Sequence, residues 1–127
     1  MTIRDSKGSR AVKQKGRTFE NEVVELFKLC GFVDAERRRQ RGTKDAGDIT
    51  GVGGLVVECK NEKKYSIPQY LKELRKEANG HYGIVALKMK GKSGKEAAAI
   101  VPIMVFGVLW SKFLSMEKEL ELLRKGQ

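Results

Sequence analysis

The sequence predicts an α/β fold in which a central mixed β-sheet is flanked by helices. Apolar residues recur at helical spacing near both ends and in the middle of the chain, and short β-prone runs lie between these segments. The predicted order of elements is α-β-β-β-α-β-β-α. Because 127 residues leave little room for a second core, we expect one compact domain.

The first half of the chain contains a predicted arm, a helix and three strands. Residues 1–15 are basic and contain little to bury, so we expect an N-terminal arm that is flexible when free, or a solvated tail. Residues 16–30 gather apolar side chains on one helical face, and Gly31 stops the helix. Strands are expected at 35–39, 48–50 and 55–60, the last two joined through GVGG as a tight hairpin.

The second half continues with two helices and two strands. Residues 67–79 have the spacing of an amphipathic helix with Leu71 and Leu74 facing inward and Glu73 outward. GIVALKM and residues 97–101 predict strands, and a C-terminal helix is expected at about 104–125. The apolar residues of this last helix most simply pack against their own domain, which would span residues 16–127.

The composition favours a polyanionic partner. The chain contains 26 Lys and Arg against 16 Asp and Glu, and its formal net charge is +10. Nucleic acid is the commonest polyanion that such a charge attracts. A charge excess that serves only solubility is the alternative, and net charge does not separate the two.

The cysteines and the N-terminal residues favour a cytoplasmic protein. Cys30 and Cys59 lie in apolar periodic segments, so they are predicted to be reduced core residues without a disulfide. The N-terminal residues contain no apolar signal-like run, and no segment reaches the roughly eighteen consecutive apolar residues of a membrane span. Secretion and membrane insertion are therefore not expected.

Three ionic residues in the β-prone segment GDITGVGGLVVECK need an explanation. Side chains alternate along a strand, so Glu58 and Lys60 share one face, opposite Val57 and Cys59. The hairpin would bring Asp48 to the same end as Glu58. Two convergent carboxylates repel each other unless a cation joins them, and Mg²⁺ or Mn²⁺ prefers such oxygen ligands.

A third acid, Glu20, falls inside the apolar arc of the first helix. At about 100° per residue it lies near 100° from Phe19, between Phe27 and Val24. A helix packed by this arc would aim the carboxylate at the sheet, which is costly unless it is paired or linked to a metal through water. The alternative is a residue at the edge of the arc that reaches solvent.

The order of these residues resembles a known motif. G-x-x-x-E at residues 16–20, then Gly47-Asp48, then Glu58-Cys59-Lys60 look like the motifs of the PD-(D/E)XK nuclease superfamily. Over about residues 8–101 the chain more closely resembles the archaeal-type Holliday junction resolvases and their phage relatives. The resemblance implies a restriction-endonuclease-like α-β-β-β-α-β core and metal-dependent hydrolysis of four-way DNA junctions. One departure is Gly47, where the superfamily name has Pro.

The resemblance also implies roles for single residues. Asp48 and Glu58 would bind Mg²⁺, for which Mn²⁺ would substitute, with the backbone carbonyl of Cys59 as a further ligand. Lys60 would orient the attacking water or stabilise the charge that develops on the phosphoryl group. Glu20 would contact the metal through water or bind a second ion. Thr43 matches the neighbourhood of a family hydroxyl that contacts the scissile phosphate.

Basic residues around this predicted site are expected to contact DNA phosphates. The run RRRQR at 37–41 immediately precedes the loop that leads to Asp48, and Lys88, Lys90, Lys92 and Lys95 could extend the basic surface. Few aromatic residues lie among these charges, which favours duplex DNA over stacked single strands. A solvated charge run is the alternative. The predicted DNA-binding residues are Arg10, Lys13, Lys15, Arg17, Arg37, Arg38, Arg39, Arg41, Lys44, Lys63 and Lys64.

Other motifs do not support a different chemistry. The stretch ALKMKGKS contains the GKS of a phosphate-binding P-loop, but Ala86 replaces the leading glycine, and a loop and a strand follow it instead of a helix. His81 is the only histidine, so neither a zinc site nor a Ser-His-Asp arrangement is supported.

The resemblance leaves two other functions open. One is another PD-(D/E)XK nuclease that acts on flaps, ends or linear duplex. The other is a non-catalytic basic DNA-binding protein whose carboxylates have structural partners. Because a four-way junction is two-fold symmetric, paired cleavage of branched double-stranded DNA would call for a homodimer, acting in the host cytoplasm if the chain is phage-encoded.

Overall fold

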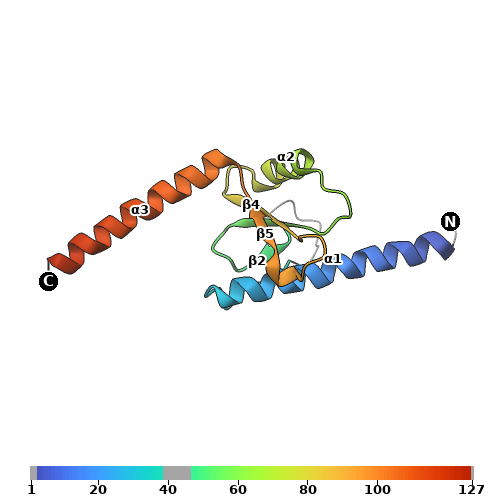
Figure 1. The fold of residues 1–127 in the computed structure, drawn as a ribbon. Helices are drawn as coiled ribbons and strands as arrows, with labels where there is room; N and C mark the ends of the chain where they lie inside the picture. Colours follow the sequence, from blue (N-terminus) through green and yellow to red (C-terminus); the bar gives the residue numbers. More distant parts are fainter. Residues whose placement is uncertain (1–2, 39–46, 127) are drawn as a thin grey trace.

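The computed structural model describes residues 3–38 and 47–126, with side chains described from residue 10 onward. Its elements follow the predicted order with a short 3-10 helix added, and the expected mixed α/β fold is confirmed (Figure 1). The elements are α1 (Ile3–Leu29), β1 (Glu36–Arg37), β2 (Ile49–Thr50), β3 (Val56–Lys60), α2 (Ile67–Ala78), β4 (Gly83–Leu87), η1 (Gly94–Glu96), β5 (Ala98–Ile100) and α3 (Ile103–Lys125).

A mixed three-stranded sheet forms the centre of the described structure. β3 and β4 run parallel along their whole length, and β5 pairs antiparallel with the other edge of β4. β1 and β2 form a separate antiparallel pair. Val57 of β3 and Val85 of β4 are fully buried, and their β-branched side chains pack well on the pleated surface.

Helices α1 and α2 cover opposite faces of this sheet (Figure 1). The cluster under α1 includes Phe19, Val23, Val24, Val57 and Ala86. The cluster under α2 includes Tyr70, Leu74, Ala78, Val56 and Val85. Successive residues of β3 therefore face different layers, and Cys59 packs with the α1 cluster as its strand position predicts.

Helix α2 has ordinary end signals. Pro68 lies in its first turn, where the missing backbone N–H costs nothing. After Ala78 the chain turns left-handed at Asn79, with φ of 46°, and again at Gly80, with φ of 90°. This C-terminal signal matches the predicted helix end at 79–80.

Helix α1 begins earlier than predicted. It starts at Ile3, so the described residues 3–15 continue the helix that the sequence analysis starts at Gly16. Figure 1 shows this N-terminal part extending beyond the sheet. A helix needs no apolar stripe where it has no core to cover, and for this reason the hydrophobic pattern indicates only the part after Gly16.

The predicted hairpin between 48–50 and 55–60 is wrong. β2 pairs with β1, and its approach to β3 is a parallel bridge between Gly47 and Val57. Gly51, Gly53 and Gly54 all have positive φ angles, of 78°, 69° and 83°. These residues turn the chain through a wider loop than a two-residue hairpin, so β3 runs in the same direction as the chain at Gly47.

Gly47 allows the backbone to approach β3 very closely. Its φ is +75°, and a Cβ there would lie 2.5 Å from the carbonyl oxygen of Val57. The next residue, Asp48, donates its backbone N–H to the same Val57 oxygen over 2.7 Å. Proline is fixed near a φ of −65°, so the Pro of the superfamily name could not adopt this conformation.

Helix α3 forms over the predicted range but does not pack as expected. Within the described part of the chain, no residue of α3 is buried, and Figure 1 shows the helix projecting away from the sheet. The prediction that its apolar residues pack against their own domain is therefore wrong. Among the described residues, no helix combines the length and the apolar character needed to cross a bilayer.

The two cysteines have different environments. Both thiols are free, Cys30 is exposed, and Cys59 is partly buried. The prediction of two core cysteines is wrong for Cys30, because α1 ends at Leu29 and the following residues lie beyond the core that α1 covers.

We expect Gly47→Ala to lower the free energy of unfolding by about 2–4 kcal/mol, as measured by urea unfolding. About 1–2 kcal/mol comes from the left-handed backbone, and the rest from overlap with the Val57 carbonyl. Gly54→Ala is the control, because Gly54 has a φ of +83° but no atom within 4 Å of its Cβ position. Equal losses in both variants would contradict the importance of the close approach.

Candidate functional site

The C-terminal half of β3 carries two of the predicted site residues. Glu58 and Lys60 are both partly buried, and they alternate with Val57 and Cys59, which pack toward α1. Glu58 and Lys60 therefore project from the face of the sheet that α2 covers. The alternation of side chains along the strand predicts this shared face for Glu58 and Lys60, opposite Val57 and Cys59.

Asp48 is held against β3 by its backbone and its side chain. Its N–H donates to the Val57 oxygen over 2.7 Å, and its carboxylate oxygen Oδ2 accepts the Cys59 N–H over 2.8 Å. On the other side, the Asp48 carbonyl accepts the Arg38 N–H over 2.8 Å. These bonds place an acid from the β2 segment beside the last residues of β3, although β2 and β3 do not form the predicted hairpin.

The Cys59 carbonyl lies on the same strand edge as Asp48. In an extended strand the N–H and the C=O of one residue point to the same side. Since the Cys59 N–H points to the Asp48 carboxylate, the Cys59 carbonyl is directed to that side as well. The carbonyl of the next residue, Lys60, points to the opposite side of the strand, where it accepts the Lys88 N–H next to β4.

The pKa values of the Asp48 and Glu58 carboxyl groups are both raised. Burial raises the pKa of Asp48 and the Glu20 carboxylate raises it further, while the Cys59 N–H and Lys60 act in the opposite direction. Burial, together with the Asp48 and Glu77 carboxylates, raises the pKa of Glu58 to about 8. Two partly buried carboxylates carry like charges, and a bound cation would reduce the cost of ionising both.

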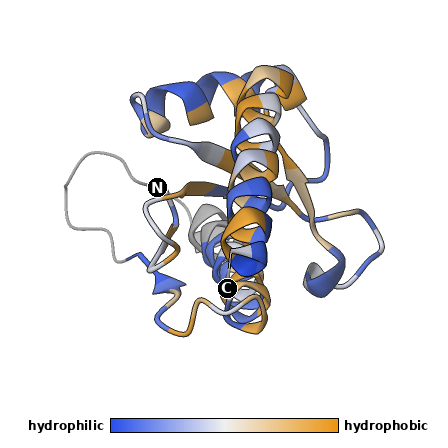
Figure 2. Ribbon diagram, turned by 90° about the vertical axis from the view of Figure 1, so that its left-hand side faces the viewer, coloured by the Kyte–Doolittle hydropathy of each residue, from blue (hydrophilic) through white to orange (hydrophobic). Residues whose placement is uncertain are grey.

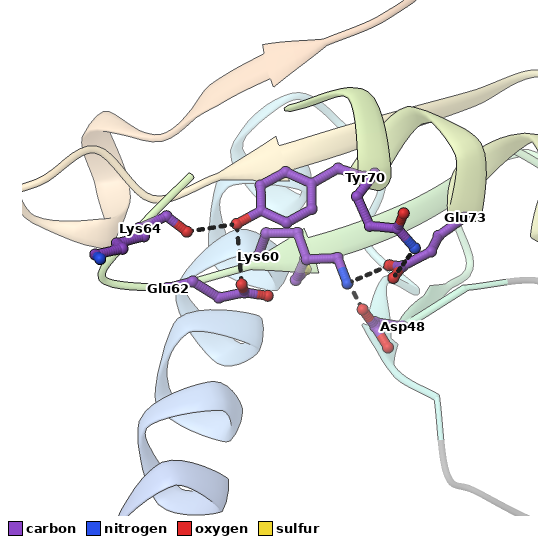
Figure 3. Close-up of polar contacts among 8 residues, drawn as sticks. Asp48, Lys60, Glu62, Lys64, Tyr70 and Glu73 are labelled. Carbon is purple, nitrogen blue, oxygen red and sulfur yellow. Dashed lines mark hydrogen bonds and ion pairs between the residues drawn. The ribbon is translucent and has the colours of Figure 1, made fainter. Parts of the chain in front are cut away.

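Lys60 is paired with an acid that the sequence analysis places on the outer face of α2. Its ammonium group donates to Glu73 Oε2 over 2.6 Å and lies 5.3 Å from the centre of the Tyr70 ring. Figure 3 shows the Lys60 Nζ atom pointing between Glu73 and Asp48. Burial is the largest influence on the pKa of Lys60 and would lower it, but the hydrogen bond to Glu73 and the charges of Glu73, Glu58 and Glu62 together raise it.

Tyr70 and its polar contacts support the Lys60 side chain. The Tyr70 ring is buried, and its hydroxyl donates to Glu62 over 3.0 Å and to the Lys64 carbonyl over 3.3 Å (Figure 3). Burial and the Glu62 hydrogen bond raise the pKa of Tyr70. The segment that follows Lys60 is thereby tied to α2.

Glu20 lies on the α1 side of the site and is not free to point into solvent. Its Oε1 atom accepts the Arg37 Nε–H over 2.9 Å, and its side chain is 21% exposed. Glu20 and Asp48 line the same hollow of about 620 Å³. The remaining residues of this hollow are mostly polar or basic: Lys13, Gly16, Arg17, Asn21, Glu36, Arg37 and Arg38.

The predicted DNA-binding residues lie in three places. Lys13, Arg17, Arg37 and Arg38 line the hollow next to Glu20 and Asp48. A second hollow of about 300 Å³, just beyond the end of β3, is lined by residues that include Lys15, Lys63, Lys88 and Lys90. Arg10 is exposed on α1 and Lys64 is exposed after β3. Arg39, Arg41, Lys44 and the candidate catalytic Thr43 lie outside the described residues.

The described residues offer a partial ligand set for Mg²⁺. Among residues 10–38 and 47–126, no three His, Cys, Asp or Glu side chains are grouped closely enough to hold a metal ion by themselves. Mg²⁺ commonly keeps several waters and binds through one or two carboxylates, so Asp48, Glu58 and the Cys59 carbonyl fit its chemistry. Glu20, engaged by Arg37, would reach such an ion only through water.

Comparisons with family models, with curated proteins and with solved structures found no match to this chain. The functional reading of the site therefore depends on its own residues.

Glu73 is the site residue that the sequence analysis misplaces. Tyr70, Leu74 and Ala78 are the buried residues of α2, and at about 100° per residue Glu73 lies only about 60° from Tyr70. The predicted inner face passes through Leu71 and Leu74, which turns Glu73 outward. Counting Tyr70 and Ala78 as buried would have placed Glu73 at the edge of the face toward β3.

We expect the stability of the metal-free protein to fall as pH rises from about 4.5 to about 8. Folding holds the proton on Glu58 up to about pH 8, whereas the unfolded chain releases it near 4.5, so the unfolded state is favoured as the pH rises. The loss should be on the order of 1–2 kcal/mol, because the partly exposed carboxyl is screened by solvent. Urea unfolding at a series of pH values measures it.

Glu58→Gln should remove this part of the pH dependence. Glu25→Gln, on the exposed face of α1, is the control that should retain it. The same slope in all three proteins would show that Glu58 titrates normally.

We expect Glu73→Gln to lower the pKa of Lys60. The substitution removes the charge that accepts the Lys60 hydrogen bond and leaves burial, which favours the neutral amine. NMR titration of the Lys60 side-chain carbon signals measures the shift. Glu77→Gln, one turn further along α2, should change the pKa of Lys60 less, and an equal effect of both variants would contradict a specific ion pair.

Proposed function

We propose that this chain is a Mg²⁺-dependent DNA endonuclease of the PD-(D/E)XK type that resolves four-way junctions by paired phosphodiester hydrolysis. The observation that supports it most is the gathering of Asp48, Glu58 and Lys60, in which burial and the Asp48 carboxylate raise the pKa of Glu58 to about 8 and the Lys60 ammonium acts in the opposite direction. Such a group is costly to fold without a cation and suits a site that acts on a phosphate.

The residues divide the chemical work in this proposal. A bound Mg²⁺ would lower the pKa of a water and neutralise charge on the phosphoryl oxygens. Asp48, Glu58 and the Cys59 carbonyl would hold the ion. Lys60 would orient the attacking water or stabilise the developing negative charge, and Glu73 would keep Lys60 protonated and in place.

The basic residues suit a duplex substrate. Lys13, Arg17, Arg37 and Arg38 line the hollow that contains Glu20 and Asp48, so phosphates held there would lie close to the carboxylates. The second hollow, with Lys15, Lys63, Lys88 and Lys90, offers contacts for phosphates further along the strand. Paired cleavage needs two active sites, so the proposal includes a second copy of the chain.

One observation favours a non-catalytic DNA-binding protein as the second candidate. Glu20 and Lys60 each have a protein partner, Arg37 at 2.9 Å and Glu73 at 2.6 Å. In that case the ionic residues would stabilise the fold. Mg²⁺ would neither change the stability of the protein nor cause cleavage of DNA.

We expect the purified chain to nick a labelled four-way junction symmetrically when Mg²⁺ is added and to stop when the ion is chelated. Asp48→Asn should lower the cleavage rate by roughly 10²–10³-fold, because a ligand of the ion is lost, while junction binding stays within a few fold. Glu25→Gln, an exposed acid on α1, is the matched control and should cleave normally.

The outcomes separate the candidates. If a linear duplex of the same sequence is cleaved at the same rate as the junction, the protein is a nuclease that does not select junctions. Binding without Mg²⁺-dependent cleavage would favour the non-catalytic candidate. Full activity of folded Asp48→Asn would show that cleavage does not need the Asp48 carboxylate as a ligand.

A further inference from the structure

Helix α3 exposes an aromatic stripe that nothing in the described structure covers. Phe106, Trp110 and Phe113 stack on one another, with ring centres 6.2 Å and 5.3 Å apart. About half of each side chain is exposed. Figure 2 looks from the side toward which α3 projects, and hydrophobic residues recur along the helix in front of the rest of the chain.

The stripe lies on a face that the body of the protein does not contact. At about 100° per residue, Phe106, Trp110, Phe113, Glu117, Leu120 and Arg124 fall within an arc of about 80°. The contacts of α3 with the body lie elsewhere on the helix. Val105 lines a hollow beside α2, and Lys112 donates to the Tyr82 hydroxyl over 2.8 Å. Both lie about 100–120° from Phe106.

The charge of α3 differs from that of the rest of the chain. The helix contains four basic and three acidic residues, a net charge of +1, whereas the whole chain carries +10. Two copies of such a basic protein repel each other least where the charge is nearly neutral. Three acidic residues at 117–121 also make this helix a poor surface for DNA or for anionic lipid.

We infer that the aromatic stripe of α3 binds the same stripe of a second copy in an antiparallel pair that crosses near Trp110. The proposed nuclease function calls for a second copy of the chain, and this inference names the surface and the orientation of the pairing from observations on α3 alone. Buried aromatic anchors are typical of interface centres. A parallel pair would place Glu117 beside Glu117 and hold both basic bodies at one end, whereas an antiparallel pair separates them.

The area of the stripe sets the expected affinity. With 150–250 Å² for each aromatic side chain, the three half-exposed rings of the stripe offer roughly 300 Å² per copy. A total of roughly 600 Å² is well below the roughly 1,200–2,000 Å² of stable interfaces, so we expect a weak dimer that forms toward the upper end of about 1–200 µM.

Sedimentation velocity of the full chain without DNA, over about 1–200 µM, tests the pairing. We expect a concentration-dependent dimer, and a blue shift in the emission of Trp110, the only tryptophan, as it forms. Trp110→Glu should weaken dimerisation at least tenfold. Met104→Glu is the matched control, because Met104 is exposed on α3 but about 160° from Phe106.

Orientation is tested with a spin label at Glu117→Cys in a Cys30→Ser background. An antiparallel pair crossing at Trp110 puts the two labelled backbones about 20 Å apart along the helices, and a parallel pair puts them side by side.

The inference is overturned by a wild-type monomer at 200 µM or by equal dimerisation of Trp110→Glu and Met104→Glu. Binding of the protein to 1:1 phosphatidylcholine–phosphatidylglycerol vesicles that needs Trp110 and replaces dimerisation would assign the stripe to a membrane surface instead. Because the measurements contain no DNA and no Mg²⁺, their failure is distinct from a failure of the nuclease assay.

Discussion

The attachment of Asp48 to β3 is the interaction on which the candidate site depends. Its N–H and its carboxylate bond to Val57 and Cys59, so the acid is fixed at the edge of a strand whose next residues are ionic. The close approach requires the positive φ of Gly47. One glycine and two hydrogen bonds therefore bring Asp48 beside Glu58 and Lys60, although the two segments do not form a hairpin.

The local periodicities of the sequence predict much of this arrangement. The two-residue period of β3 places Val57 and Cys59 toward α1 and Glu58 and Lys60 toward α2, and the helical period of α1 places Phe19 and Val23 in the core. These predictions succeed because each depends only on whether neighbouring side chains are apolar or ionic. The structure is compatible with the α/β class that they imply.

Features that depend on distant contacts were not predictable. The sequence of residues 51–54 predicts a tight hairpin, whereas three positive φ angles give this segment a wider loop. Glu73 looks like a surface residue until Lys60 is placed against α2, and the apolar residues of α3 look like core until the helix is seen to leave the body. In each case the sequence contains the right residue types but not the partner that decides their role.

The different exposure of the two thiols protects the strand that carries Glu58 and Lys60 from reagents that modify cysteine. Burial raises the pKa of the Cys59 thiol, so almost no reactive thiolate forms there, whereas Cys30 is exposed just past the end of α1. Oxidants and alkylating agents will modify Cys30 first and spare the strand that carries Glu58 and Lys60. A fluorophore attached at Cys30 would therefore report on the molecule without disturbing the residues proposed to act on DNA.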